Sequence, residues 1–268
     1  MRPTRLALAL ALAMFAVPLS ALAQESGETA DPAQESAPSD EAADPEPDAD
    51  EGEAEGPASN WSWNLTLTSD YVFRGVTQSN YKPALQAGFD YSFGDSGWYV
   101  GTWASNVDYN DPDGPDLELD VYVGWSHDLA EDWNLDLSVV HYAYAGQRNG
   151  YGSLDYAEAI GAITWAETVT LSVGYAPDYS DAGYSSTWIG LAGSWEVGDE
   201  FSINAGVGHS RFSDDNGNYT DWNIGVSRQF GPVNAALNYY DTNLDFEDGD
   251  EHQHASDQVV LSFAFGNG

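Results

Sequence analysis

Charged residues interrupt several segments in which apolar side chains occupy every second position. The charges assigned to the polar phase of these segments are Asp70, Arg74, Lys82, Asp90, Asp108, Glu118, Asp120, Asp136 and Glu196. Successive side chains of a strand point to opposite faces, so these charges fall on one face and the apolar residues on the other. Carboxylates that surround an aqueous passage favour cations over anions. We therefore predict that this set lines a water-filled interior.

Metal ligation has two candidate segments, and neither matches a defined site. The acidic stretch at 246–254 offers Asp250, His252 and His254 as weak candidate ligands. The stretch at 111–116 has a carboxylate density like that of calcium loops but lacks their spacing and terminal bidentate Glu. Solvated acidic loops are the commoner explanation for both stretches. We predict no metal site and no cofactor.

Hydrolysis has less support. His141 and His209 share one phase of the alternation, and Ser210, Asp214 and Asp215 lie close to His209. No nucleophile elbow, HExxH motif or paired-carboxylate spacing accompanies them. We therefore predict no catalytic residue, and a hydrolase is kept only as the alternative from another class.

Alternation with period two covers most of the chain after residue 60. It is clearest in the first segment, where one face carries Trp61, Trp63, Leu65, Leu67, Tyr71 and Phe73. Comparable patterns predict strands near 85–93, 117–125, 133–139, 169–175, 201–207, 233–239 and 258–265, and less regular strands near 98–109, 156–165, 186–196 and 221–230. The region is predicted to be all-β with about twelve strands.

Connections between these strands alternate in length along the chain. Short turns such as 94–97 and 166–167 alternate with longer loops such as 145–153 and 241–256. With an even number of strands, all short turns lie at the end that bears both termini. Bacterial outer-membrane barrels show this asymmetry, with short periplasmic turns and long external loops. Aromatic residues near both strand ends suggest interfacial girdles, whereas the alternative, a soluble antiparallel sandwich, gives no reason for them.

The predicted fold is therefore a transmembrane antiparallel up-and-down β-barrel with lipid outside and water inside. Tyr71 and Phe73 are expected to face lipid near the external end, while Asp70 and Arg74 face the lumen. On the lipid side, a mid-bilayer Arg would cost roughly 2–4 kcal/mol. The phase chosen for the strand around Glu158 also turns that carboxylate inward.

Charges inside such a barrel are expected to pair. Asp70 and Arg74 lie about 13 Å apart on an extended strand, so each is expected to meet a charge on a neighbouring strand. Lys82 and Asp90 offer adjacent partners. Twelve strands lie between barrels of about eight, whose side chains fill the interior, and open porins of 16–18 strands, so a narrow pore is expected. In the alternative, the inward charges merely pair and the barrel is plugged.

Both composition and the N-terminal segments indicate export. Residues 1–23 have the features of a secretory signal peptide, and residues 24–60 form an acidic Pro/Ala-rich linker that is expected to be disordered in the periplasm. Residues 61–268 are assigned to the barrel. The formal net charge of −37 argues against nucleic acid as a partner, because phosphate binding requires clustered Lys and Arg. The chain has no cysteine and hence no disulfide.

Two segments carry a resemblance to a known family. The runs at 69–78 (SDYVFRGVTQ) and 101–108 (GTWASNVD) resemble the signature segments of the TorF-type porin family, which was first catalogued as a bacterial protein of unknown function. The layout of residues 60–265 is similar too. This resemblance implies an outer-membrane barrel but supplies no substrate.

The expected function is a porin-like channel for passive diffusion of small solutes, favouring cations or neutral molecules. The expected location is the outer membrane of a Gram-negative bacterium, with both termini periplasmic. Its partners would then be outer-membrane lipid and lipopolysaccharide, the barrel-assembly machinery and small solutes. Two alternatives remain open: a closed structural or adhesive barrel without transport, and an outer-membrane hydrolase.

Overall fold

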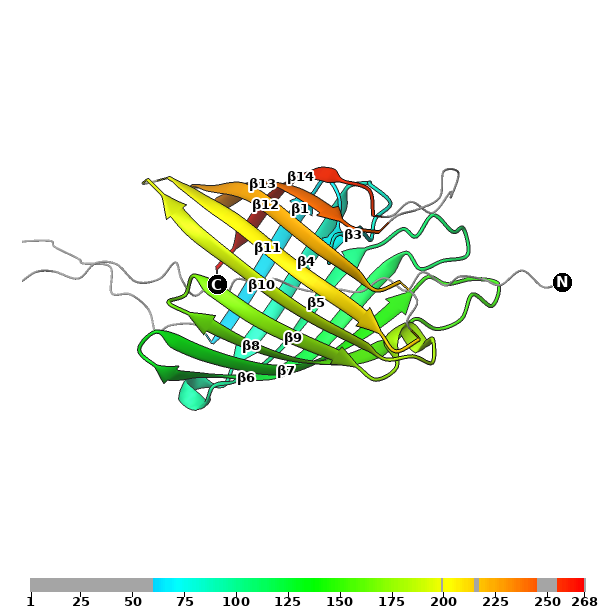
Figure 1. Cartoon of the computed structure of the whole chain (residues 1–268), viewed down its shortest axis with the longest axis horizontal. Coiled ribbons are helices and arrows are strands. Elements are labelled where there is room, and N and C mark those ends of the chain that lie inside the picture. Colours follow the sequence, from blue (N-terminus) through cyan, green and yellow to red (C-terminus); the bar gives the residue numbers. More distant parts are fainter. Residues whose placement is uncertain (1–59, 199, 215–216, 245–254, 268) are drawn as a thin grey trace, which may run out of the picture.

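Twelve antiparallel strands close into a barrel, as Figure 1 shows. The computed structural model describes residues 60–198, 200–214, 217–244 and 255–267. The barrel strands are β1 (Trp61–Thr68), β4 (Ala84–Ser92), β5 (Trp98–Asn106), β6 (Leu117–Ala130), β7 (Trp133–Ala145), β8 (Tyr156–Trp165), β9 (Val169–Ala176), β10 (Ser186–Val197), β11 (Phe201–Phe212), β12 (Tyr219–Phe230), β13 (Val233–Thr242) and β14 (Gln258–Gly266). Each barrel strand pairs with the next one along the chain, and β1 closes the barrel against β14.

Apolar side chains cover the outside of the barrel. Leu85, Val121, Val139, Ile189 and Ile224 are each about half exposed, at 48–56% of their surface. Their sequence neighbours on the opposite phase point inward and include the polar residues Gln86, Asp120, Tyr122, Ser138 and Asn223. Exposure of so large an apolar surface to water would be unfavourable, whereas barrels that span a membrane present such a surface to lipid. The molecule is therefore a transmembrane barrel, and the sandwich alternative is wrong.

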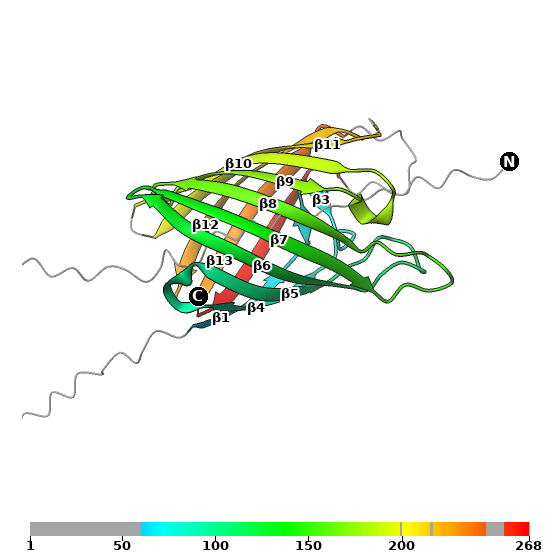
Figure 2. The same ribbon diagram turned by 90° about the horizontal axis from the view of Figure 1, so that it is seen from below.

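Short turns and long loops lie at opposite ends of the barrel, as predicted (Figure 2). The short-turn end holds the connections 93–97, 131–132, 166–168 and 231–232, together with the end of β10, the start of β11, the start of β1 and the end of β14. The long-loop end holds the connections 69–83, 107–116, 146–155 and 177–185, together with the facing ends of β11 and β12 and of β13 and β14.

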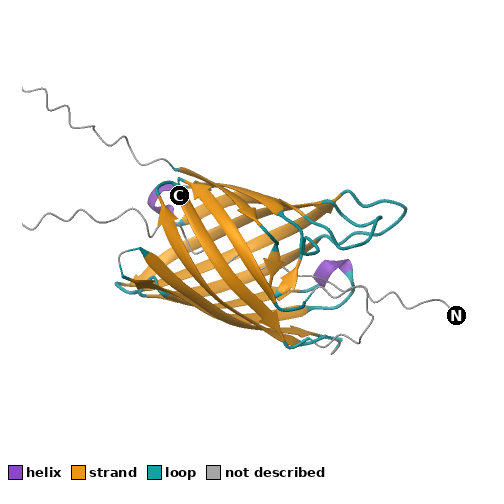
Figure 3. Cartoon of the chain, turned by 90° about the horizontal axis from the view of Figure 1, so that it is seen from above, coloured by secondary structure: helices purple, strands orange, loops and turns teal. Residues whose placement is uncertain are grey.

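Helical structure in the described ranges is limited to two 3₁₀ turns, η2 (Gly94–Ser96) and η3 (Tyr179–Asp181), drawn in purple in Figure 3. No helix within those ranges is long and apolar enough to span a membrane. The predicted signal peptide and nearly all of the predicted acidic linker, residues 1–59, lie outside the described residues.

The first long connection folds back into the barrel. The sequence pattern extended the first strand to residue 74, but β1 ends at Thr68, and residues 69–83, here called the inner segment, turn inward. Within the inner segment, β2 (Val72–Phe73) pairs with β3 (Val76–Thr77). Tyr71 and Phe73 are only 5% and 1% exposed, so the expectation that they face lipid is wrong.

Aromatic residues behave differently at the two ends. At the short-turn end a girdle of exposed rings is present, as predicted, with Trp61, Trp98 and Trp165 each about half exposed. At the long-loop end, Tyr142, Tyr144 and Tyr219 are at most 8% exposed and point inward. Their positions follow the alternation, because Tyr142 and Tyr144 share the phase of the inward Ser138. The predicted outer girdle at this end is therefore wrong for most of its members.

Candidate functional site

The inner segment is held together by a carboxylate near its start. The Asp70 carboxylate accepts hydrogen bonds from the hydroxyls of Thr77 and Ser79, and the Tyr71 backbone N–H donates to Ser79 Oγ at 2.9 Å. Burial raises the pKa of the Asp70 carboxyl above its ordinary value, and these hydrogen bonds oppose the rise. Asp70 thus organises the inner segment internally and does not meet a charge on a neighbouring strand.

An ion pair fastens the inner segment to the opposite wall. Arg74 Nη2 donates to both carboxylate oxygens of Glu158 on β8 at 3.0 Å, and these side chains are 1% and 0% exposed. The guanidinium also lies 4.6 Å from the ring centroid of Trp188 on β10 and 4.8 Å from that of Phe73. Because β8 and β10 lie across the barrel from β1 and β4, the inner segment spans the lumen. The inward phase chosen for Glu158 is confirmed.

The turn that presents Arg74 is tightly seated. Arg74 and Gly75 have φ values of 44° and 80°, as a two-residue hairpin of type I′ requires. A long side chain is uncommon in this conformation, and the contacts of the guanidinium hold it there. A Cβ atom on Gly75 would overlap the Thr242 methyl group and lie 2.8 Å from Asp221 Cβ. The turn therefore also abuts β12 and β13.

A buried aromatic cluster fills the space around the inner segment. Tyr142 and Tyr156 stack with centroids 4.5 Å apart, and Tyr156 contacts Tyr179 at 5.0 Å. On the other side, the Tyr71 ring meets Trp103 edge to face at 5.4 Å. With these rings and the inner segment in place, the long-loop half of the barrel is packed.

Two of the predicted charges lie behind the inner segment. Glu118 and Asp120 point inward from β6 and are 0% exposed. The Tyr71 hydroxyl lies 3.4 Å from both carboxylate oxygens of Glu118. Within the described ranges no Lys or Arg forms an ion pair with either acid.

Two other predicted charges lie in the short-turn half of the interior and are partly exposed. Asp90 on β4 accepts a hydrogen bond from the Tyr122 hydroxyl, and Asp136 on β7 accepts one from the Tyr99 hydroxyl at 2.9 Å. Both strands point these carboxylates inward, so their exposed surface borders the interior. Water therefore reaches this half of the barrel.

The remaining predicted charges lie at the rims. Lys82 pairs with Asp108 at the long-loop end. The expectation that Lys82 and Asp90 are the partners of Asp70 and Arg74 is therefore wrong, since Arg74 pairs with Glu158. Glu196 is exposed near the short-turn end of β10. The predicted set omitted Glu158 and the two tyrosines that hold Asp90 and Asp136. Their inward phase was the available signal, because Tyr122 alternates with apolar Val121 and Val123.

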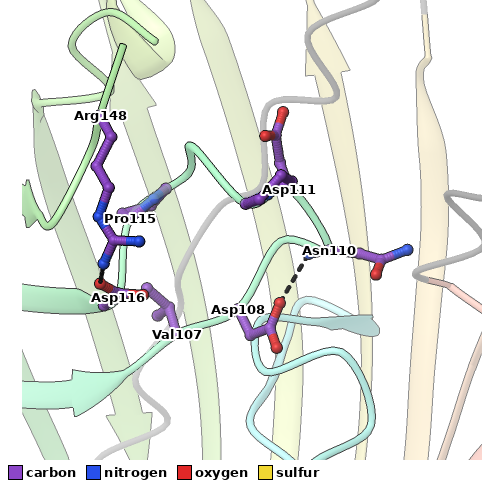
Figure 4. A pocket seen from close by; sticks show the side chains of 8 residues that line it. Val107, Asp108, Asn110, Asp111, Pro115, Asp116 and Arg148 are labelled. Atoms are coloured by element: carbon purple, nitrogen blue, oxygen red, sulfur yellow. Dashed lines mark hydrogen bonds and ion pairs between the residues drawn. The ribbon is translucent and has the colours of Figure 1, made fainter.

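An open groove of about 440 Å³ lies among the long loops, over the acidic stretch at 111–116 (Figure 4). Its carboxylates have partners: Asp116 meets Arg148 at 3.0 Å, and Asp108 accepts a hydrogen bond from the Asn110 backbone N–H at 2.8 Å. No cluster of three or more potential metal ligands occurs in the part of the chain that the structure describes. Asp250, His252 and His254 lie outside the described residues.

Comparison with known protein families shows to which family the chain belongs. A family described as "bacterial protein of unknown function (Gcw_chp)" matches residues 51–263. The chain belongs to the Gcw_chp family. This match supports the resemblance inferred from residues 69–78 and 101–108, although the family's description does not carry the name TorF. The two segments lie together in the barrel, where the Asp108 N–H donates to the Gln78 carbonyl at 2.8 Å.

The solved structure of the NanC porin shows the same fold at low sequence identity. The NanC porin is 9% identical with a TM-score of 0.50, over 75% of this chain and 97% of that one. The KdgM porin is 5% identical with a TM-score of 0.48, over 77% and 98% of the chains. LpxR from Salmonella typhimurium is 9% identical with a TM-score of 0.41, over 76% and 99%. No curated protein matches the sequence. The similarity to NanC concerns the barrel fold of this Gcw_chp protein and does not indicate which solutes pass through it.

Proposed function

We propose that this Gcw_chp protein is an outer-membrane channel for passive diffusion of small solutes, favouring cations or neutral molecules. The observation that carries the proposal is the divided interior: a polar, partly exposed half at the short-turn end, and a half closed by one inward-folded connection at the long-loop end. A barrel with a purely structural role has no need for a polar interior that water reaches. The names of the KdgM and NanC porins are consistent with this assignment.

The proposed location is the outer membrane of a Gram-negative bacterium. The short-turn end, with both barrel termini, would face the periplasm, and the long loops would meet lipopolysaccharide outside. Delivery would use the predicted signal peptide and the barrel-assembly machinery. No catalytic role is proposed, because His141 and His209 lie exposed on the outer face without a nucleophile arrangement.

Ions can pass only if the inner segment moves out of its packed position in the long-loop half of the lumen. Its hold on the far wall depends on the Arg74–Glu158 pair, which lies in a desolvated setting. Removing one partner would leave the other charge buried and unpaired, which typically costs 3–5 kcal/mol. Removing both partners takes away the attachment without leaving a stray charge.

The test is conductance of the purified protein in planar lipid bilayers. We expect Arg74→Ala/Glu158→Ala to spend several-fold more time conducting than the unaltered protein. Arg148→Ala/Asp116→Ala, which removes an exposed ion pair of the outer loops, is the matched control and should change little. Absence of ion current in the folded double variant at Arg74 and Glu158 would overturn the channel.

A closed structural barrel is the second candidate, and the packed long-loop half favours it. In that case neither double variant conducts, although both migrate as folded barrels on unheated gels. The two candidates therefore differ in one measurement on the same pair of proteins.

A further inference from the structure

Two tyrosines lie flat along the interior wall and reach in opposite directions. Tyr122 of β6 passes over Gly101 of β5, its register partner, and its hydroxyl donates to Asp90, the partner of Gly101 on β4. Tyr99 of β5 passes over Gly124 of β6 and donates at 2.9 Å to Asp136 of β7. Each tyrosine therefore bridges two strand spacings to hold one carboxylate.

Glycine makes both crossings sterically feasible. A Cβ on Gly101 would overlap the Tyr122 ring, and a Cβ on Gly124 would overlap the Tyr99 ring. The two rings also contact each other edge to face, with centroids 6.4 Å apart. The four residues form one rigid unit on β5 and β6, so the two aspartates occupy defined positions on either side of it.

The charges of these aspartates have no counterion. Neither Asp90 nor Asp136 takes part in an ion pair within the described ranges. Of the described cations, Arg74 lies in the packed half, Lys82 and Arg148 in the long loops, and Arg211 and Arg228 on the outward phase of their strands. An ion inside the short-turn half therefore meets negative charge on the β4–β7 wall.

The facing wall carries amides in place of charges. Asn204, Asn223 and Asn238 point inward from β11, β12 and β13, and Asn204 Nδ2 donates to Ser227 Oγ at 3.2 Å. Gly206 and Gly225 make room for the amides of Asn223 and Asn238 in the same way that Gly101 makes room for Tyr122. Apart from Asp128 and Glu196 at the short-turn rim, Asp90 and Asp136 are thus the described carboxylates that face the interior of this half.

We propose that Asp90 and Asp136, held by Tyr122 and Tyr99, determine the cation preference of the channel, with the tyrosines as positioning residues. This inference rests on the proposed channel function. The set expected from the sequence to line the pore contained Asp90 and Asp136 together with Glu118 and Asp120. The inference narrows that set, because Glu118 and Asp120 are wholly buried behind the seated inner segment. A permeating cation meets the two partly exposed carboxylates in the short-turn half whether the inner segment is seated or displaced.

The experiment measures reversal potentials across a KCl gradient, in the unaltered background and in the Arg74→Ala/Glu158→Ala background. We expect Asp90→Asn/Asp136→Asn to lower the ratio of potassium to chloride permeability several-fold. Asp116→Asn, which removes a carboxylate of the outer loops and not one that faces the short-turn half, is the matched control and should change the ratio far less. If Asp90→Asn does not fold, Asp136→Asn alone carries the test.

The positioning role has its own readout. Tyr122→Phe keeps the ring and removes only the hydroxyl, so it should lower the permeability ratio in the Asp90 protein and have no effect once Asp90→Asn is present. Equal effects in both backgrounds would contradict positioning. An unchanged ratio in a conducting Asp90→Asn/Asp136→Asn protein would overturn this inference alone, whereas absence of current in every variant would overturn the channel itself.

Discussion

The guanidinium of Arg74 meets one acid and two aromatic rings, an arrangement that an ammonium group cannot reproduce. A planar, weakly hydrated cation can stack on Trp188 while its Nη2 bonds Glu158, whereas the lysine charge is compact and strongly hydrated. Lysine would also have to adopt the positive φ of 44° without the same anchorage. Charge alone therefore does not explain how the inner segment is held.

We predict that Arg74→Lys weakens the attachment of the inner segment to β8 and β10, although it preserves the positive charge. Conducting time should rise to a level between those of the unaltered protein and the Arg74→Ala/Glu158→Ala variant, as measured by single-channel recording. Arg148→Lys, at an exposed ion pair, serves as the control and should have no effect. Identical traces for Arg74→Lys and the unaltered protein would show that stacking contributes nothing.

At the scale of single residues, the sequence predicted which face of the sheet a side chain occupies better than which residue it contacts. Two phases were open for the strand around Glu158, and the one chosen, with Ala157 and Ala159 outside, is confirmed by the exposure of both alanines. The partner of Glu158, Arg74, lies 84 positions away and reaches it across the barrel, not along a strand pair. Alternation reports which face a side chain occupies but carries no information about contacts across a lumen.

At the scale of strands, the alternation of apolar and polar residues does not predict where the first strand ends. Residues 61–73 alternate with little interruption, so nothing in the period marks the departure of the chain from the wall after Thr68. Tyr71 and Phe73 keep an apolar phase inside the barrel because the aromatic cluster, not lipid, surrounds them. An apolar phase alone cannot distinguish these two apolar environments.

The opposite faces of β7 allow a matched test of the lipid-facing assignment. We predict that Val139→Arg, near the middle of the strand on the outer face, destabilises the barrel by about 2–4 kcal/mol. Ser138→Arg places the same side chain one residue away on the inner face and should cost less. Urea unfolding in lipid vesicles measures both, and equal losses of stability would contradict the assignment.

For the molecule as a whole, the strand number and the alternation of loop lengths could be read from the sequence. Both depend on local features, namely period-two patterning and turn residues. Occlusion of the lumen depends on a connection that folds inward against strands on several sides of the barrel, among them β6, β8, β10 and β13, and no local pattern encodes such contacts. The fold was thus predictable, whereas the state of the interior was not.

The barrel wall should not need the inner segment. Thr68 and Ala84 face each other in the register of β1 and β4, so a two-residue Asn-Gly turn can replace residues 69–83. We predict that this variant still migrates as a folded barrel on unheated gels and conducts continuously in bilayers. Failure to reach the folded form, while Arg74→Ala/Glu158→Ala does, would mean that the segment supplies core packing essential to closure.

The junction between β1 and β14 is the shortest in the barrel, with five paired positions from Asn64 to Thr68, whereas β1 and β4 share eight. The inner segment hangs from the strand that forms this junction. On heating, β1 and β14 should therefore separate before any other pair of strands. The inner segment follows β1 directly and would leave the lumen together with it. In the unaltered protein, in which the Arg74–Glu158 pair holds the inner segment, opening of the lumen and unfolding of the barrel would then occur in a single thermal transition.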